Sequence, residues 1–315
     1  MEPSRRLVKA AAFLFLIHWA NPAYAGNLEI AQESQREAYI QTSQPSVRFT
    51  VATYNVQARP VLDAAEQKFR AIGPLLDQFQ IVALQECFTA HRLLWAQTTF
   101  PSRIHDGSKT AWYRLVSSGL SLLSRFRAKE ASVQKFRDPA GLRYLFRAQK
   151  DGLASKGVLF ARYDLGNGRL LDVYNTHMEA GGDETSSEAR RIQAGELVHF
   201  VNSQSPPDNA VLLVGDFNMR PLGKRKSGRR QALRDPSSLE RSQLLESISG
   251  QLGLTNAGSL AGRPPSKTLD HIFFRSGTKT QLKPVAWKVE RSSFRDAAGN
   301  SWSDHDPVIA TFIAE

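Results

Sequence analysis

Polar side chains able to bind a metal ion or to move a proton recur at the ends of apolar runs in this 315-residue chain. Four runs finish in Tyr54-Asn55, Gln85-Glu86, Thr176-His177 and Gly215-Asp216-Phe217-Asn218, and a fifth polar group, Ser303-Asp304-His305, directly precedes the last run. In open α/β sheets, sites form where strand ends and their following loops converge. One polar residue at a strand end carries little information, but five such groups are hard to explain as core and predict one shared site.

The residue types indicate the chemistry of that site. Glu86, Asp304 and the amide oxygen of Asn55 are hard oxygen ligands suited to Mg²⁺, with Mn²⁺ or Ca²⁺ as alternatives. His177 and His305 can move protons near neutral pH or hydrogen-bond to a phosphoryl oxygen. Either histidine alone would more often be an ordinary hydrogen-bonded residue. Beside hard-cation ligands and an Asp/Asn pair, however, they fit attack of water on a phosphoester, with no covalent nucleophile.

Short apolar runs predict the strands that carry these side chains. Val47, Phe49, Val51 and Thr53 recur with a period of two, as on one face of a strand. Further strands are predicted at residues 81–84, 158–160, 170–174, 211–214, 272–274 and 308–310. Several of these runs are continuously apolar, as in strands that are covered on both faces.

Helices are predicted between the strands. The clearest begins near Thr185, whose spacing to Glu188 suits a capping box, and apolar residues at 194, 197, 198 and 201 fall on one of its faces. We find no repeat or linker in residues 47–315, so these predict a single α/β domain. Residues 26–46 are polar, with no pattern beyond a possible short helix.

The first 25 residues have the order of a secretory signal peptide. Arg5, Arg6 and Lys9 form a positive start, residues 10–20 are apolar apart from one histidine, and Ala23-Tyr24-Ala25 offers small residues for cleavage after Ala25. The alternative is an uncleaved anchor, although the apolar stretch is too short for a spanning helix. We therefore expect export, to the periplasm or outside the cell.

The net charge indicates which kind of partner to expect, and the cysteine content limits the chemistry. Residues 1–25 hold three basic residues and one acidic residue, so their removal lowers the formal charge from +11 to +9, which favours anionic partners. Basic runs at 125–150 and 222–235 are either solvated surface or contacts for phosphate or a membrane surface. Cys87, the only cysteine, excludes an internal disulfide and is expected to be a small core residue rather than a nucleophile.

The ordered motifs resemble those of the endonuclease/exonuclease/phosphatase superfamily. Beyond the groups above, Ser118-Gly119-Leu120, Leu123-Ser124-Arg125 and Leu269-Asp270 stand in that family's order. The resemblance covers essentially all of residues 47–315. It implies a four-layer α/β sandwich, with two mixed β-sheets packed face to face and helices outside.

The resemblance also implies a role for each site residue. Glu86 is expected to be the principal metal ligand, with Asn55 and Asp304 nearby in the coordination sphere. His305 resembles the general base for the attacking water, and Asp270 would fix its tautomer through the other ring nitrogen.

Three further residues complete the implied site. His177 would bond to the phosphoryl oxygen or assist the leaving group, and Asp216 and Asn218 would orient the water, bind the phosphate or help a second metal. His199, on the predicted helix, and His271, next to Asp270, are expected to be structural or exposed.

The substrate is a phosphodiester whose class the motifs only partly define. Residues 151–160 resemble the Ser/Asn-Lys-Gly stretch of the neutral sphingomyelinase branch, where Lys156 beside a flexible glycine would place a cation against the substrate phosphate. The resemblance implies phospholipase C-type hydrolysis of sphingomyelin to phosphocholine and ceramide, by a monomer in peripheral contact with the membrane.

Two alternatives remain open. The basic residues at 224–230 would equally suit a nucleic-acid backbone, which makes a secreted non-specific endonuclease the second hypothesis. The chain also shows no clear paired-aromatic hairpin for entering a membrane. A non-catalytic binding module is disfavoured, because both Glu86 and His305 are present.

Overall fold

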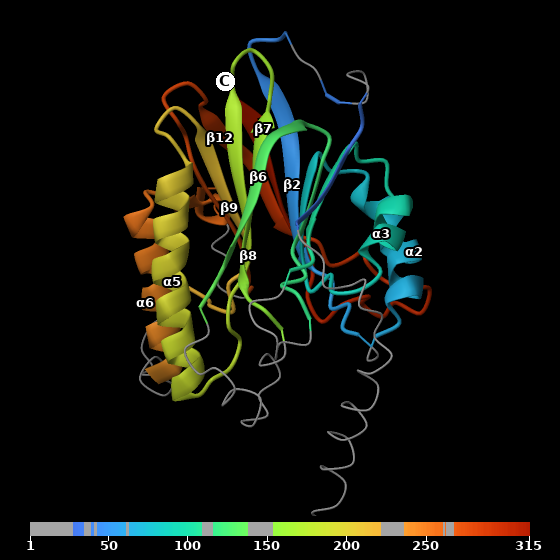
Figure 1. The fold of residues 1–315 in the computed structure, drawn as a ribbon, viewed down its shortest axis with the longest axis vertical. Coiled ribbons are helices and arrows are strands. Elements are labelled where there is room, and N and C mark those ends of the chain that lie inside the picture. The colour runs from blue at the N-terminus through green and yellow to red at the C-terminus, as the bar shows by residue number, and fades with distance from the viewer. Residues whose placement is uncertain are drawn as a thin grey trace, which may run out of the picture.

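Two β-sheets pack face to face, with helices on their outer faces (Figure 1). This computed structural model describes residues 28–34, 39–40, 43–60, 63–108, 116–137, 154–221, 236–260, 262 and 268–315. The four-layer α/β sandwich that the sequence predicts is confirmed. The predicted signal peptide, the basic run at 222–235 and residues 138–150 of the other basic run lie outside the described residues.

The first sheet has seven strands in the order β1-β4-β5-β3-β2-β13-β12. They are β1 (Leu28–Gln32), β2 (Val47–Asn55), β3 (Ile81–Gln85), β4 (Ser102–Asp106), β5 (Ser121–Ser124), β12 (Leu282–Val289) and β13 (Val308–Ala314). Only β2 and β3 are parallel neighbours, so the sheet is mixed.

The second sheet has six strands in the order β10-β11-β9-β8-β7-β6. They are β6 (Arg127–Lys135), β7 (Gly157–Asp164), β8 (Leu170–His177), β9 (Ala210–Asp216), β10 (Thr255–Asn256) and β11 (Asp270–Arg275). Here β8 and β9 are the parallel pair. Every apolar run predicted as a strand lies in one of these two sheets, so those predictions are confirmed.

The helices cover the outer faces of the two sheets (Figure 1). Helices α2 (Ala65–Leu76) and α3 (His91–Ala96) lie on one side, and α5 (Glu184–Gln204) and α6 (Pro236–Gln251) on the other, while α7 (Ala257–Leu260) is a single turn. Two parallel strands need a crossover to join them, and α2 and α5 supply it for β2–β3 and β8–β9. Within the described residues, no helix is long and apolar enough to span a membrane.

Apolar side chains fill three clusters, one between the sheets and one under each pair of helices. Val51, Leu122 and Val173 belong to the cluster between the sheets. Phe69 of α2 packs against the outer face of the first sheet, and Leu197 of α5 against that of the second. Central strands are therefore apolar on both faces, as their continuous apolar runs predict. Full burial of each such side chain contributes about 1.5–3 kcal/mol.

The N-terminal segment differs from the prediction of at most a short helix. Leu28–Gln32 forms β1, which adds to the edge of the first sheet by antiparallel pairing with β4. Glu29 on β1 also accepts hydrogen bonds from His91 and Arg92 of α3, at 2.9 and 3.1 Å. The segment is a strand because its backbone completes the edge of β4, which is a tertiary effect that local composition does not report.

The start of helix α5 also differs from the prediction. Asp183 is the N-cap, and its side chain accepts a hydrogen bond from the backbone N–H of Ser186 at 2.8 Å. Thr185 therefore lies inside the first turn rather than at the cap. The apolar face is as predicted, with Leu197 and Val201 fully buried.

Candidate active site

Strand pairing brings the predicted site residues to one end of the sandwich. In the second sheet, His177 ends β8 opposite Asp216 of β9, and Asp216 in turn lies opposite Asp270 of β11. In the first sheet, Asn55 ends β2 opposite Gln85, the last residue of β3. Because the ends of both parallel pairs lie at the same edge, side chains from two sheets meet there.

The backbone turns sharply at Glu86. Gln85 faces the second sheet, so in a regular strand the next side chain would point outward, because alternate residues face opposite sides. Glu86 instead has a φ of 54°, and its carboxylate faces the same site as Asn55. Left-handed backbone at a non-glycine residue is uncommon and concentrates at functional sites.

Asp216 is the centre of the network. The Asn55 Nδ2 group donates to Glu86 Oε1 and to Asp216 Oδ2, both at 3.1 Å, and so joins the two sheets. Asp216 Oδ1 accepts the backbone N–H of Asn218 at 2.9 Å, and the Asn218 side chain donates to Met178 O. Asp216 therefore lies beside Glu86, closer to the predicted cation ligands than the sequence motif implied.

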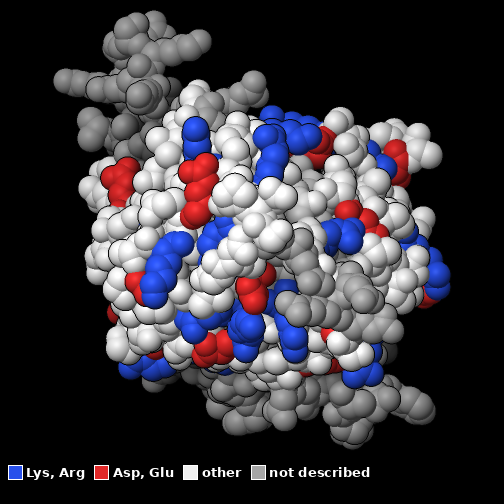
Figure 2. Space-filling view, turned by 90° about the horizontal axis from the view of Figure 1, so that it is seen from above, with Lys and Arg blue, Asp and Glu red and all other residues white. Residues whose placement is uncertain are grey.

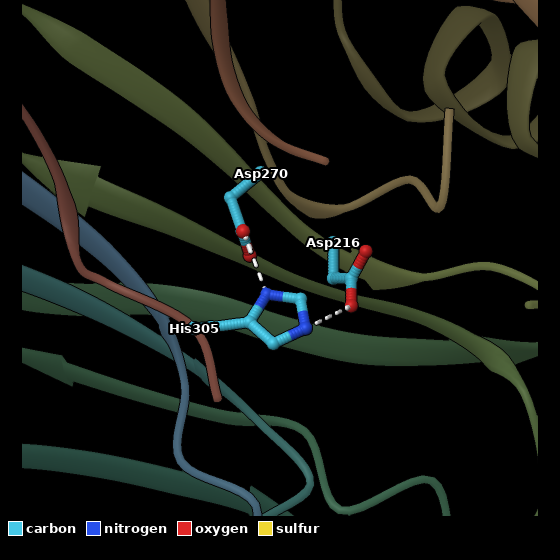
Figure 3. A group of neighbouring side chains, drawn as sticks. All are labelled: Asp216, Asp270 and His305. Carbon is cyan, nitrogen blue, oxygen red and sulfur yellow. Dashed lines mark hydrogen bonds and ion pairs between the residues drawn. The ribbon is translucent and has the colours of Figure 1, made fainter. Parts of the chain in front are cut away.

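His305 stands between two carboxylates (Figure 3). Its Nδ1 lies 2.8 Å from Asp270 Oδ2, and its Nε2 lies 3.7 Å from Asp216 Oδ2. Thr268 Oγ1 accepts the backbone N–H of Asp270 at 3.0 Å, which fixes the start of β11. The carboxylate of Asp270 thus orients the ring, and Nε2 is the nitrogen that faces the rest of the site, as the sequence predicted.

The close charges shift the pKa values of both partners. Burial and the charge of Asp270 raise the pKa of Asp216 to about 7. Burial alone would lower the pKa of His305, but the hydrogen bond to Asp270, with the charges of Asp270, Asp216 and Asp304, raises it to about 10. Without a cation, His305 is therefore held in its charged form at neutral pH.

A second imidazole lies on the other side of Asp216. His177 Nε2 is 3.6 Å from Asp216 Oδ2 and 3.0 Å from Lys156 Nζ. Because an ammonium can only donate, His177 Nε2 is the acceptor in this contact with Lys156. Lys156 is 4% exposed, so its cation lies inside the site rather than on a surface turn.

Gly157, next to Lys156, is required for close packing and not for flexibility, contrary to the prediction. A Cβ on Gly157 would lie 2.6 Å from the backbone oxygen of Gln134 on β6. The approach of β6 leaves no room for a side chain, and that contact fixes the strand that carries Lys156.

The donor set at Asn55, Glu86 and Asp216 fits a hard divalent cation. Two carboxylates converge on one amide, and a cation between them would relieve their repulsion. To present Oδ1 as predicted, the Asn55 amide has to turn over and give up the hydrogen bond from Gln57 N–H. Asp304 is exposed, with Oδ1 3.5 Å from Ser303 Oγ, and its role as a ligand stays a prediction.

Asp216, Asp270 and His305 form another arrangement that can hold a cation, with one ligand atom of each within 4.8 Å of the others. One imidazole gives a metal one nitrogen, however, and here Nδ1 and Nε2 face different carboxylates. The geometry therefore favours His305 as the proton-carrying group and Asp216 as the carboxylate shared between it and a cation.

Residues outside the predicted set hold the site in place. Ser303 Oγ donates to the backbone oxygen of Asn55 at 2.6 Å and ties the loop before β13 to β2. Arg241 donates to the backbone oxygens of Ala180 and Gly181, at 3.2 and 2.6 Å, in the loop that follows His177. The sequence position of Arg241 carries no signal, because it binds backbone oxygens that become neighbours only in the fold. Ser303, in contrast, stands in the predicted Ser303-Asp304-His305 group, although no role was assigned to it.

Two histidines outside the site and the cysteine are as predicted. His199 is exposed, and His271 is buried with Nε2 2.9 Å from the backbone oxygen of Met219. Cys87 is fully buried in the cluster under α2 and α3, and burial raises the pKa of its thiol to about 12. A thiol held protonated in this way is not a nucleophile.

A profile of the Endonuclease/Exonuclease/phosphatase family matches residues 52–305, which include all the site residues described above. The chain belongs to this family. The two packed mixed sheets seen here are also those of solved structures with the same fold.

Similar proteins include a sphingomyelinase from Mycobacterium tuberculosis, 25% identical over 287 residues. The alignment covers 84% of this chain, which spans only 52% of that relative's length. Two solved structures share the fold: beta toxin from Staphylococcus aureus with bound magnesium ions, and D. rerio TDP2 complexed with a single-strand DNA product. The toxin is 18% identical with a TM-score of 0.57, covering 84% of this chain and 99% of the toxin. TDP2 is 16% identical with a TM-score of 0.58, covering 84% and 98%.

Proposed function

We propose that this protein is an exported phosphodiesterase, that it depends on a divalent cation, preferably Mg²⁺, and that it hydrolyses sphingomyelin to phosphocholine and ceramide. The main observation behind the proposal is the network around Asp216. His305, paired with Asp270, lies on one side of Asp216, and Glu86 lies on the other side, where the two carboxylates could bind a cation. Water attack on a phosphodiester requires both a base and a centre of positive charge.

His305 is the base in this proposal. Glu86 and Asp216 would hold the cation, which would supply positive charge against the phosphoryl oxygens and would lower the pKa of His305 toward neutrality. Neutral His305, with its proton on Nδ1 held by Asp270, then takes the proton of water at Nε2. The water oxygen bonds directly to phosphorus as the P–O bond to ceramide breaks, and the ceramide oxygen takes a proton from water. Asp270 stabilises the imidazolium of His305, which then releases its proton to solvent.

Lys156 provides the positive side of the site, and His177 lies next to it. Both are buried, and they lie 3.0 Å apart through Nζ and Nε2. In a buried position a cation acts strongly on the developing charge of a phosphoryl oxygen, because little water screens it. We therefore assign them to the phosphate, with Asn218 holding the adjacent loop.

A lipid substrate is favoured by sequence similarity. The mycobacterial relative named a sphingomyelinase aligns with 84% of this chain. The second candidate is a nucleic-acid phosphodiester, because a formal charge of +11 attracts DNA as readily as an anionic membrane. Export rests on residues 1–25, and a peripheral, monomeric mode of action is part of the same proposal.

Purified protein with Mg²⁺ tests the proposal on sphingomyelin vesicles and, in parallel, on supercoiled plasmid DNA. We expect phosphocholine release that EDTA and His305→Ala both abolish, without plasmid nicking. Nicking without phosphocholine release would refute the lipid substrate and establish the nuclease. Activity on either substrate that persists in EDTA would contradict the cation requirement.

A further inference from the structure

The site is divided between two sheets that are held together mainly by apolar contacts. Asn55 and Glu86 extend from the first sheet, whereas His177 and Asp216 extend from the second. Apolar packing is not directional, so it sets the spacing between the sheets more firmly than their lateral alignment. Catalysis is sensitive to that alignment, because a displacement of 1 Å can cost about 100-fold in rate.

A pair of buried amides crosses between the sheets directly below the site. Gln85 Nε2 donates to Asn175 Oδ1 at 2.7 Å, and both side chains are fully buried. Asn175 Nδ2 donates in turn to the backbone oxygens of Leu84 and Ser121, at 2.8 and 2.9 Å. One side chain of β8 is thus bonded to three residues of the first sheet.

The amide pair is adjacent in sequence to the reacting groups. Gln85 immediately precedes Glu86, and Asn175 lies two residues before His177 on the same face of β8. A shift of either amide therefore moves a site residue by a similar distance, since one or two stiff backbone units separate them.

The two buried amides lower the stability of the fold, which would be at least as stable with apolar side chains at these positions. Their presence therefore suggests a role other than stability. Gln85 Oε1 is buried, and among the described residues it has no hydrogen-bond partner. A buried polar atom left unbonded destabilises the fold, and two leucines there would avoid that cost. Hydrogen bonds, unlike leucines, fix a direction and a distance.

We propose that Gln85 and Asn175 are positioning residues, whose hydrogen bond between the sheets aligns Glu86 with His177 and Asp216 for the reaction. The proposal rests on the hydrolytic function proposed above. It does not depend on which phosphodiester is the substrate.

The test compares the full chain with Gln85→Leu, Asn175→Leu and the double variant, using bis(4-nitrophenyl) phosphate and Mg²⁺. This activated diester reports hydrolysis whether the biological substrate is lipid or nucleic acid. We expect kcat to fall by about 10- to 100-fold in each single variant, with KM changed less than 3-fold. The double variant should be no slower than the worse single variant, because both remove the same bond.

Two control variants remove buried hydrogen bonds that do not join the sheets. Thr53→Val deletes the 3.0 Å contact of Gln85 within the first sheet, and Tyr174→Phe deletes the 2.7 Å contact with Ser205 at the end of α5. Both should unfold at a lower temperature yet keep kcat within 3-fold of the wild type. Gln85→Met, which keeps the length of the side chain, replaces Gln85→Leu if that variant does not fold.

The outcomes separate the two proposals. Folded Gln85 and Asn175 variants with wild-type kcat would overturn the positioning role and leave the hydrolytic function intact. Losses in the two single variants that multiply in the double variant would also overturn it. A wild-type protein inactive on this diester, on sphingomyelin and on plasmid DNA would overturn the hydrolytic function and the positioning role with it.

Discussion

Replacing Asp216 by asparagine is expected to stabilise the metal-free protein at neutral and alkaline pH. Asp216 is 1% exposed, and burial together with the charge of Asp270 raises its pKa to about 7, from 3.8. Each pKa unit corresponds to about 1.4 kcal/mol, so ionising this carboxyl in the folded protein costs on the order of 4 kcal/mol. The asparagine is uncharged, and it retains an oxygen that can accept the N–H of Asn218.

The sign of the pH dependence follows from the raised pKa. The folded protein keeps the proton on Asp216 up to about pH 7, whereas the unfolded chain releases it near pH 3.8. Folding stability from this group is therefore fully present below pH 3.8 and is lost as the pH rises to 7. Wild-type protein in EDTA should thus lose stability between pH 4 and 8, and Asp216→Asn should lose less.

Urea unfolding in EDTA at pH 5 and pH 8 measures both effects. We expect Asp216→Asn to unfold at higher urea concentration than the wild type at pH 8, to lack the wild-type response to Mg²⁺ and to have no measurable turnover. Asp172→Asn is the matched control, because Asp172 is also buried but bonds Arg162 at 2.7 Å. Asp172→Asn removes the charge that faces Arg162, which then keeps Glu130 as its carboxylate partner, and should lower the free energy of unfolding by about 1–3 kcal/mol. Equal pH dependence in wild type and Asp216→Asn, or an Asp216→Asn protein less stable at pH 8, would refute the electrostatic reasoning.

Three further changes test other parts of the site. Asp270→Asn removes one of the groups that raise the pKa of His305 to about 10, so in EDTA the NMR titration of this histidine should move to lower pH and turnover should fall about 100-fold. An unmoved titration contradicts the pairing. Glu86→Gln should raise the Mg²⁺ concentration for half-maximal activity at least about 10-fold, and an unchanged Mg²⁺ titration would exclude Glu86 as a ligand. Gly157→Ala forces a Cβ to within 2.6 Å of Gln134 O, so the free energy of unfolding should fall by about 1–3 kcal/mol, with a lower melting temperature. An unchanged melting temperature would show that β6 can move away.

The sequence predicted the strands and the ends that carry the site, because both follow from local patterns. Runs such as Val211–Val214 are apolar on both faces, and they are buried in the centre of a sheet. Polar residues such as Asp216 directly follow these runs, so strand pairing alone brings them together. The order of the motifs then implied the fold through resemblance to one family.

Other features depend on neighbours that are distant in sequence, and local patterns did not predict them. Leu28–Gln32 is a strand only because β4 offers an unpaired edge. Position 157 requires glycine because β6 passes too close to leave room for a side chain. From the sequence alone, a glycine after a lysine suggests a flexible turn. The inter-sheet bond between Gln85 and Asn175 joins residues 90 apart, and its two halves were visible only as polar residues within apolar strands. The signal peptide and the basic 222–235 run stay predictions.

The most direct measurement follows oxygen-18 from water into the products of sphingomyelin hydrolysis by the wild type and by His305→Ala. If His305 activates water against phosphorus, phosphocholine carries one oxygen-18 atom, ceramide carries none, and folded His305→Ala forms product at least about 100-fold more slowly. Label in ceramide, or an undiminished rate in His305→Ala, would contradict the account.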